Sequence, residues 1–333
     1  MQVWQIETVS GRPVRVSHPA PVPAKGELRV RVMAAGLNFA DLLMIDGTYQ
    51  ACPALPYVPG LEFAGIVELA NQDTPAFPAG TRVLGTCGCG ALAEFITVPA
   101  SRLFPLPDQM DFAEAAGFPI AYGTSHLALT HKARLQPGET LFVTGAAGGV
   151  GLTAVEIGKA LGARVIASAR GADRLAVAKA AGADALIDSN APDLREALRS
   201  LGGVDVVFDT VGGPAFDAAL RACKPDGRLL AIGFASGQVP QVQANLLLVK
   251  NLTVTGLWYG GYQTHAPDVV AASMTQLLQM RAAGQIHPHV GQVLPFEGFP
   301  EGLALLRDRK ATGKVVIRVS QTPNNQAPIN QAP

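Results

Sequence analysis

The spacing of hydrophobic and polar positions changes along the chain and divides it into three blocks. Up to about Pro107, short runs of β-branched and apolar residues are separated by Gly and Pro, a pattern typical of strands joined by turns. These runs predict strands over residues 28–33, 65–69, 82–84 and 94–98. We therefore expect the first block to be mostly β.

The second block opens with a helical pattern and continues as alternating strands and helices. Apolar and small residues recur at helical spacing over 113–133. From Thr140 onward, continuous apolar runs predict strands over residues 141–144, 164–169, 185–188, 204–209 and 228–233. Strands that alternate with helices in this way predict a parallel sheet.

The third block begins after about Gly261 and leads back to the first. Its apolar positions predict one helix, through Val269, Val270, Met274, Leu277 and Leu278. A strand predicted over 314–319 can rejoin the β-rich block, so we expect the first domain to be discontinuous. Residues 321–333 repeat NQAP without apolar periodicity, and we expect a disordered tail there.

Composition and charge narrow the classes of function. The 333 residues are 48% hydrophobic and 16% charged, which excludes wholesale disorder. Lys plus Arg equals Asp plus Glu, at 26 each, so no net field attracts nucleic acid or anionic lipid. The longest charge-free stretch, 229–249, contains several Gln and Asn side chains that are costly in hydrocarbon, so we expect no membrane span.

The cysteines and the N-terminal residues predict a compartment. Four cysteines are too few for a disulfide scaffold at this length. Polar residues occupy the first positions, where a secretory signal would carry a basic start and an apolar core. We therefore expect free thiols, a cytoplasmic location and small-molecule partners.

A glycine-rich turn follows the predicted strand 141–144 and opens an apolar helix. Gly148 allows a pyrophosphate to approach the backbone, Gly151 allows the helix to pack closely on the strand, and the helix N-terminus supplies free amides. Ala146 stands where the usual fingerprint has its first glycine, so a purely structural turn is the alternative. The predicted cofactor contacts here are Gly145, Ala146, Ala147, Gly148, Gly149, Val150 and Gly151.

The tip of the next strand predicts which dinucleotide binds. Ser168 and Arg170 lie there, Arg174 follows, and no Asp or Glu stands at the tip to bond a ribose 2′-hydroxyl. Because a guanidinium pairs with a 2′-phosphate, we expect NADPH (NADP) rather than NADH. The alternative for either arginine is a solvated surface charge, and Asp173 is a possible partner of one of them.

Two more turns follow predicted strands at their carboxyl ends, where ligands bind in open parallel sheets. These turns span 209–213 and 232–237. Small residues in them allow backbone contacts with ribose and nicotinamide, although small loops are also ordinary turns. The candidate contacts are Val211, Gly212, Gly233, Phe234 and Ser236.

Several motifs taken together resemble one family. They are GLNFAD at 36–41, PGLE at 59–62, TGAAGGVG at 144–151, DTVGG at 209–213 and GKVV at 313–316. Over residues 2–320 the chain resembles the zinc-independent quinone oxidoreductases of the medium-chain dehydrogenase/reductase superfamily, relatives of zeta-crystallin.

The resemblance implies an α/β fold with two domains and a cleft between them. A GroES-like, β-rich catalytic domain would comprise residues 1–123 and 262–320, which agrees with the return of the third block to the first. A Rossmann domain with a doubly wound parallel sheet would comprise residues 124–261.

The resemblance also bears on metals. Zinc-dependent members of the superfamily carry a catalytic Cys where this chain has Asn38, and a His where it has Leu61. Glu62 alone cannot supply the three ligands of a catalytic zinc. Cys87 and Cys89 form a C-x-C pair without the companions of a structural zinc site. We expect no metal.

Without a Lewis acid, hydride transfer requires an acceptor that is already electrophilic, such as a quinone or a conjugated carbonyl. The resemblance implies that Asn38, Asp41 and Tyr49 lie beside the nicotinamide as catalytic residues, with Tyr49 the best candidate donor to a substrate oxygen. Each has an alternative. For Asn38 the alternative is a cap on the helix that begins near Phe39. For Asp41 it is a role in orienting its neighbours, and for Tyr49 it is a turn position with the hydroxyl in water.

The resemblance adds cofactor contacts at Thr124, Ser189 and Lys314. Two positions depart from the family pattern, since Leu43 replaces a frequent second Tyr and Ser189 replaces an aromatic residue near the adenine phosphate. The substrate and the fine phosphate contacts therefore stay open.

The function that these observations favour is an NADPH-dependent quinone reductase with its site in the interdomain cleft. One alternative is a reductase of α,β-unsaturated carbonyls such as enals, enones or enoyl thioesters. Another is a non-catalytic NADPH-binding protein with a crystallin-like or sensor-like role. The resemblance further implies a homodimer paired through an edge strand at 251–258, where Trp258 either packs beside the seam or lines a pocket with Tyr259 and Tyr262.

Overall fold

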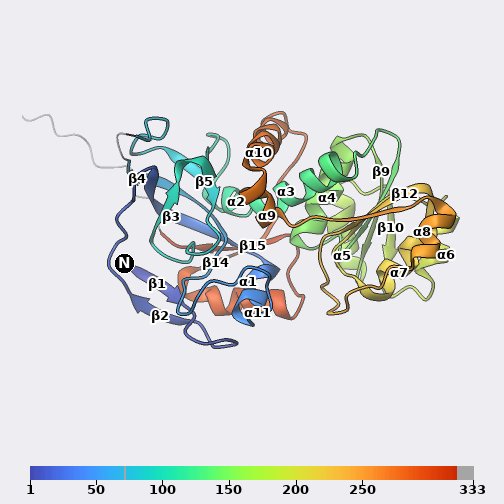
Figure 1. The fold of residues 1–333 in the computed structure, drawn as a ribbon, viewed down its shortest axis with the longest axis horizontal. Helices are drawn as coiled ribbons and strands as arrows, with labels where there is room; N and C mark the ends of the chain where they lie inside the picture. Colours follow the sequence, from blue (N-terminus) through green and yellow to red (C-terminus); the bar gives the residue numbers. More distant parts are fainter. Residues whose placement is uncertain (71–72, 321–333) are drawn as a thin grey trace, which may run out of the picture.

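In a computed structural model, residues 1–70 and 73–320 form two neighbouring β-sheets with helices between and around them (Figure 1). The predicted tail at 321–333 lies outside the described residues, so its disorder stays a prediction. Within the described ranges, no helix has both the length and the apolar character needed to cross a bilayer.

The sheet on the right of Figure 1 is parallel and doubly wound, with strand order β10-β9-β8-β11-β12-β13. Its strands are β8 (Thr140–Thr144), β9 (Arg164–Ala169), β10 (Ala185–Asp188), β11 (Val204–Asp209), β12 (Cys223–Ala231) and β13 (Thr253–Gly256). The helices that connect them are α4 (Gly149–Ala160), α5 (Ala172–Ala180), α6 (Leu194–Ser200), α7 (Gly213–Ala222) and α8 (Ala244–Lys250). The strand order reverses between β8 and β11, and dinucleotides bind at such a point.

The central strands of this sheet are continuous apolar runs because helices cover both faces. Every residue of β8 is buried, and so is every residue of β11 except Asp205. Polar residues stand only where the strands end, and two of them pair there. Thr144 Oγ1 donates to Asp209 Oδ1 at 2.6 Å, which ties the ends of β8 and β11 together beside the turns predicted to bind the cofactor.

The second sheet is mixed, with strand order β14-β15-β3-β4-β5-β7 and with β6 also paired to β3. Its strands are β3 (Glu27–Leu37), β4 (Glu62–Leu69), β5 (Arg82–Thr86), β6 (Phe95–Pro99), β7 (Leu103–Pro105), β14 (Val290–Pro295) and β15 (Lys314–Arg318). Around it lie the hairpin strands β1 (Gln2–Gln5) and β2 (Val14–Ser17), the helices α1 (Phe39–Ile45) and α11 (Phe299–Arg307), and the 3₁₀ turns Ala100–Arg102 and Phe296–Gly298. β15 joins the N-terminal strands, as the third block predicted, whereas the boundaries 123/124 and 261/262 stay predictions.

β3 runs four residues beyond its predicted end at Met33, and this extension positions the candidate site. The added residues pair antiparallel with β15, in the register Val315 to Leu37. The extension consists of small residues, which give no strand signal in the sequence. The packing requires a small residue at Gly36, because a Cβ there would lie 2.3 Å from the Ala116 carbonyl oxygen. The pairing brings the first residue of β15 beside the start of α1.

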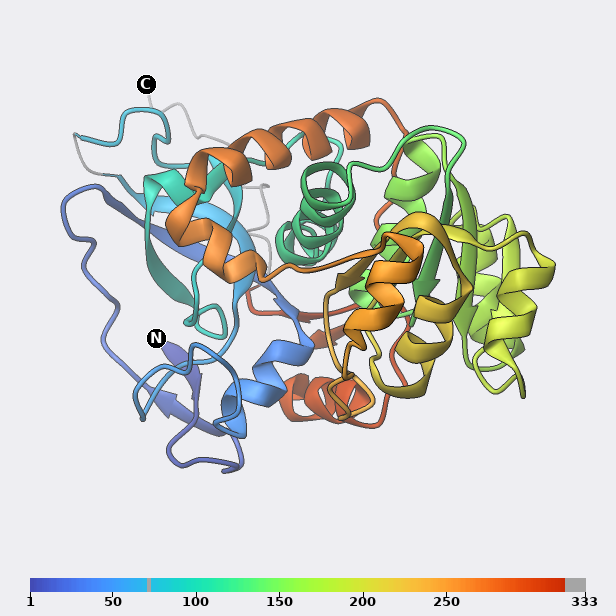
Figure 2. The same ribbon diagram turned by 45° about the vertical axis from the view of Figure 1, so that its right-hand side comes forward.

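The helices between the sheets are α2 (Phe112–Ala116), α3 (Pro119–His126), a π-helical turn (Leu127–Lys132), α9 (Tyr259–His265) and α10 (Pro267–Ala282). Figure 2 shows α10 crossing beside α3. The helical pattern predicted over 113–133 is confirmed by α2, α3 and the π-helical turn. The helical run is interrupted at Gly117, where a Cβ would lie 3.0 Å from the Cβ of Lys314, and it restarts with Pro119, which suits a first helical position.

Candidate cofactor and active site

The glycine turn between β8 and α4 has the geometry of an anion cradle. Gly145 adopts φ 59°, and Gly148 precedes the helix in an extended conformation. A Cβ on Gly151 would lie 2.2 Å from the Gly145 carbonyl oxygen, so the helix approaches the turn as closely as predicted. A Cβ on Gly148 would meet only that same oxygen, at 3.3 Å, and would otherwise face open space. The amides at the start of α4 are free of helical partners.

The two further turns join each other below this cradle. Gly212 N–H donates to Asp209 Oδ2 at 2.8 Å, and burial raises the pKa of Asp209 above its usual value. Ala235 N–H donates to the Thr210 carbonyl at 3.1 Å, and Ser236 N–H donates to that of Val211 at 2.9 Å. The predicted contacts Val211, Gly212, Gly233, Phe234 and Ser236 therefore belong to one bonded pair of loops at the carboxyl edge of the sheet.

The predicted 2′-phosphate residues have different surroundings. Arg170 is exposed at the tip of β9, and its guanidinium bonds to none of the residues that the structure describes. Arg174 instead donates to the backbone carbonyl of Arg309. Ser168 is buried, and its carbonyl accepts the Ala146 N–H at 3.0 Å, whereas the exposed Ser189 donates its N–H to Ala169. Arg170 is thus the freer of the two cations.

Asn38 and Asp41 form the start of α1 and are both buried. Asp41 accepts the Asn38 N–H at 2.8 Å and the Gly60 N–H at 3.3 Å, which fits the orienting role held open for it. Burial raises the pKa of Asp41 to about 7, although these backbone donors and the Lys314 ammonium act in the opposite direction. Asn38 occupies the cap position of α1, but its side-chain amide bonds to Glu62 and Lys314.

Lys314 lies 5% exposed beside the fully buried Glu62. Its ammonium donates to the Leu37 carbonyl at 2.6 Å, to Asn38 Oδ1 at 2.7 Å and to Glu62 Oε1 at 2.7 Å. Asn38 Nδ2 donates to the same carboxylate oxygen at 2.8 Å, and Ile120 N–H bonds the other oxygen at 2.8 Å. All three hydrogens of the Lys314 ammonium are thus used inside the protein, and its contact with the cofactor stays a prediction.

Tyr49 lies in the loop after α1, half-buried, with its hydroxyl near the segment that follows β13. The indole Nε1 of Trp258 donates to that hydroxyl oxygen at 3.0 Å. Tyr259 and Tyr262 are buried in the core between the sheets, whereas Trp258 is 43% exposed. Thr124, predicted to contact the cofactor, is a buried residue of α3.

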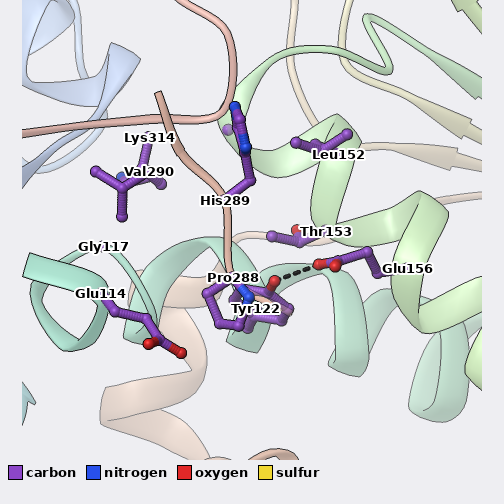
Figure 3. A pocket seen from close by; sticks show the side chains of 11 residues that line it. Glu114, Gly117, Tyr122, Leu152, Thr153, Glu156, Pro288, His289, Val290 and Lys314 are labelled. Atoms are coloured by element: carbon purple, nitrogen blue, oxygen red, sulfur yellow. Dashed lines mark hydrogen bonds between the residues drawn. The ribbon is translucent and has the colours of Figure 1, made fainter. Parts of the chain in front are cut away.

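A small cavity of about 10 Å³ lies behind the cradle, close to the size of one water (Figure 3). The residues that line it include Gly149, Lys314, Tyr122, Glu156 and His289. Tyr122 donates its hydroxyl proton to Glu156, which also accepts the His287 N–H at 3.0 Å. These bonds hold α3 and α4 against the chain that leads into β14.

Comparison with known proteins agrees with this geometry. A model of the alcohol dehydrogenase GroES-like domain matches residues 24–108, and a zinc-binding dehydrogenase model matches residues 149–277. The bovine quinone oxidoreductase-like protein 2 is 38% identical over 311 residues, which are 92% of this chain and 89% of the relative. The chain belongs to the quinone oxidoreductase family of the medium-chain dehydrogenase/reductase superfamily.

Solved structures of this family share the whole fold. The Thermus thermophilus quinone oxidoreductase, also determined with NADPH, is 34% identical with a TM-score of 0.85, over 96% of this chain and 100% of that one. The Escherichia coli quinone oxidoreductase complexed with NADPH is 28% identical with a TM-score of 0.87, over the same shares of 96% and 100%. A GroES-like domain and a Rossmann domain are therefore confirmed.

The superfamily includes zinc enzymes, and a catalytic zinc needs three protein ligands. Among the residues that the structure describes, no three His, Cys, Asp or Glu side chains cluster as ligands would. Glu62 has both oxygens bonded, and an ammonium stands 2.7 Å from one of them, where it would repel a dication. The residues around Glu62 do not fit zinc.

Two relationships of the candidate site are not evident from the sequence. Glu62 was considered only as a lone metal ligand, although it is the centre of a buried network. Trp258 was expected either to pack beside a dimer seam or to line a pocket, and its bond to the candidate donor Tyr49 was not foreseen. A polar residue at the end of an apolar strand was the available signal for Glu62, and no local signal pointed to Trp258.

Proposed function

We propose that this protein is an NADPH-dependent, zinc-independent reductase of quinones. The observation that carries the proposal is the junction of an open glycine cradle with a buried Asn38–Glu62–Lys314 network that does not fit a metal. Without a Lewis acid on the substrate oxygen, the acceptor has to be activated by its own conjugation. Quinones meet that requirement.

The preference for NADPH rests on Arg170. Its guanidinium is exposed at the end of β9, beside the turn that receives the adenine ribose in doubly wound folds, and it has no partner among the described residues. A free guanidinium suits a phosphate. The NADPH complexes of the Thermus and Escherichia coli relatives support the same choice.

The bound cofactor would supply hydride, and residues of the chain would bind and polarise the acceptor. Tyr49 is the donor in this proposal, because Trp258 occupies its oxygen as a donor and leaves the phenol proton available. Burial raises the pKa of Tyr49, so the phenol stays protonated at neutral pH. Asn38 and Asp41 then act by holding the start of α1 rather than by touching the acceptor.

Two measurements test this function. The first compares kcat/KM for NADPH oxidation across quinones, enals, enones and enoyl thioesters, and the proposal expects quinones to be preferred at least tenfold. A preference for enals or enoyl thioesters would favour the conjugated-carbonyl reductase instead. Tight NADPH binding without turnover of any acceptor would favour the non-catalytic alternative.

The second measurement compares NADPH and NADH binding in Arg170→Ala, with Arg195→Ala as a control that removes an exposed arginine of α6. We expect NADPH affinity to fall about 10- to 100-fold in Arg170→Ala, consistent with loss of a charge-assisted pair, with little change for NADH. Equal losses for both nucleotides would remove the argument for NADPH.

The proposal extends to assembly and location. We infer a homodimer paired through β13, which is the edge of the parallel sheet, and a cytoplasmic protein whose four cysteines remain thiols. The domains in this proposal are residues 1–123 with 262–320 and residues 124–261, with the substrate between them.

A further inference from the structure

Lys314 connects the two halves of the candidate site through its own backbone and side chain. It is the first residue of β15, and its pairing partner strand β3 ends beside it. The stem is enclosed by glycines, because a Cβ on Gly117 would lie 3.0 Å from Lys314 Cβ and one on Gly149 would lie 3.1 Å from Lys314 Cδ. A side chain at either glycine would therefore crowd the stem of Lys314.

The backbone end of the connection reaches the cofactor cradle. Gly313 N–H donates to the Ala147 carbonyl at 2.8 Å, and Gly313 forms a parallel bridge with Gly148. The two residues of the cradle that would face a pyrophosphate are therefore bonded to the residue that precedes Lys314. The backbone at Gly313, which a substitution of the Lys314 side chain leaves in place, thus holds the cradle.

The ammonium end reaches the substrate side. Its three hydrogen bonds fix the end of β3, the amide of Asn38 and the carboxylate of Glu62. Glu62 is fixed in turn by Ile120 at the start of α3. Three distant stretches of the sequence, at residues 37–38, 62 and 314, thus meet at one cation.

We propose that Lys314 is a positioning residue for the reaction, whose charge holds Asn38 and Glu62 in register with the glycine cradle. This inference rests on the proposed function for its kinetic consequence. A buried ion pair that served stability alone would not need to join the cradle to the start of α1. The charge of Lys314 therefore has to act on the site as well as on the fold.

The charge acts on Asp41, the titratable group nearest the network. Asp41 faces Lys314, which lowers its pKa, and Glu62, which raises it. The other titratable groups that face it are Tyr49, Tyr57 and Cys87, and burial raises the pKa of each, so that they stay neutral near pH 7. Removing the cation and removing the carboxylate should consequently move the Asp41 titration in opposite directions.

The test uses Lys314→Met, Glu62→Gln and the double variant, with Lys25→Met as the control for loss of one exposed ammonium. The Asp41 carboxyl is followed by NMR in protein labelled with carbon-13 aspartate and assigned through Asp41→Asn. We expect its midpoint to rise by at least half a pH unit in Lys314→Met, to fall in Glu62→Gln, and to return towards the wild-type value in the double variant. The double variant leaves no buried unpaired charge, so it keeps the test usable if Lys314→Met folds poorly.

Kinetics on the same variants separates positioning from cofactor binding. With the best quinone, kcat should fall at least tenfold in Lys314→Met, while the Kd for NADPH changes less than threefold and Lys25→Met behaves as wild type. An Asp41 midpoint that is the same in every variant would overturn the inference, and so would a loss in Lys314→Met confined to NADPH affinity. If the wild type reduced no quinone, the proposed function would fail, whereas the titrations in the free protein would still decide whether Lys314 controls Asp41.

Discussion

The indole N–H of Trp258 donates a hydrogen bond of 3.0 Å to the Tyr49 hydroxyl, although 209 residues separate the two in the sequence. Tyr49 follows α1 of the GroES-like domain, and Trp258 follows the edge strand of the Rossmann sheet. The bond therefore joins the two domains at the candidate donor. It also orients the phenol, because an oxygen that accepts one hydrogen bond directs its own proton elsewhere.

Tyr49→Phe removes the candidate donor and should reduce kcat/KM for quinones by about 10- to 1000-fold, the range seen when one hydrogen-bond donor to developing charge is lost. Trp258→Phe leaves the donor in place but frees its orientation, so we expect a smaller loss of about 3- to 10-fold. Steady-state kinetics at saturating NADPH measures both. Tyr262→Phe, which alters a buried phenol away from the cradle, is the control and should retain activity. A full effect of Trp258→Phe with none of Tyr49→Phe would assign the role to the indole.

Asp41 should make stability depend on pH. Its pKa is raised from 3.8 to about 7 in the folded protein, so between these values the folded state holds a proton that the unfolded state has lost. The free energy of unfolding attributable to this group consequently falls as the pH rises from about 4 to 7, by up to about 4 kcal/mol. Asp41→Asn removes the ionisation.

Urea unfolding at several pH values checks this sign. The difference in unfolding free energy, wild type minus Asp41→Asn, should decrease steadily with rising pH through that window. A difference that is flat, or that increases with pH, would show that Asp41 titrates at its ordinary value in the folded protein.

The sequence predicts well those structural features that depend on residues close to one another in the chain. The strands at 164–169, 185–188 and 204–209 were predicted with their observed bounds, because each is a continuous apolar run between turns. The close approach required at Gly151 was likewise visible in the spacing of glycines. Local periodicity is sufficient for such features.

The network around Lys314 could not be predicted in this way. It forms only because β3 pairs with β15, and that pairing joins residues 276 apart, as the bond from Lys314 to Asn38 shows. The small residues at the end of β3 carry no strand signal, so the strand was predicted to stop short of the contact. The family resemblance predicted Lys314 as a cofactor contact, and the bond from its ammonium to Glu62 was not foreseen.

Alanine substitutions at two glycines of the cradle should affect different properties, stability at Gly151 and nucleotide binding at Gly148. In Gly151→Ala the new methyl group would meet the backbone oxygen of Gly145, which cannot move aside, so we expect a loss of stability of about 1–3 kcal/mol or more. In Gly148→Ala the new methyl group has space, so we expect the free energy of unfolding to stay within about 1 kcal/mol of the wild-type value. The methyl group would, however, stand where a pyrophosphate approaches the turn.

Thermal unfolding and nucleotide titration separate these effects. We expect Gly148→Ala to weaken NADPH and NADH equally, by about tenfold or more, since both nucleotides carry the pyrophosphate. That pattern differs from the NADPH-selective loss expected for Arg170→Ala. Unchanged binding in Gly148→Ala would mean that the nucleotide does not dock on this turn.

The edge of the parallel sheet makes the proposed dimer testable. Among the strands that the structure describes, β13 pairs with β12 alone, and the preceding helix α8 exposes Leu248 at 80% and Val249 at 79%. Apolar side chains this exposed beside an open strand edge favour association with a second copy. We expect sedimentation to give twice the 34.6 kDa chain mass for the wild type.

Val249→Glu should weaken that association by at least about 100-fold, because it places a carboxylate in the contact. Val22→Glu is the matched control, since Val22 is 85% exposed on the GroES-like domain, away from β13. Monomeric wild type, or equal dissociation of both variants, would exclude pairing through this edge. A dimer that survives Val249→Glu but not a proline at Thr255 would keep the strand pairing and remove α8 from the contact, because proline cannot donate to the strand ladder.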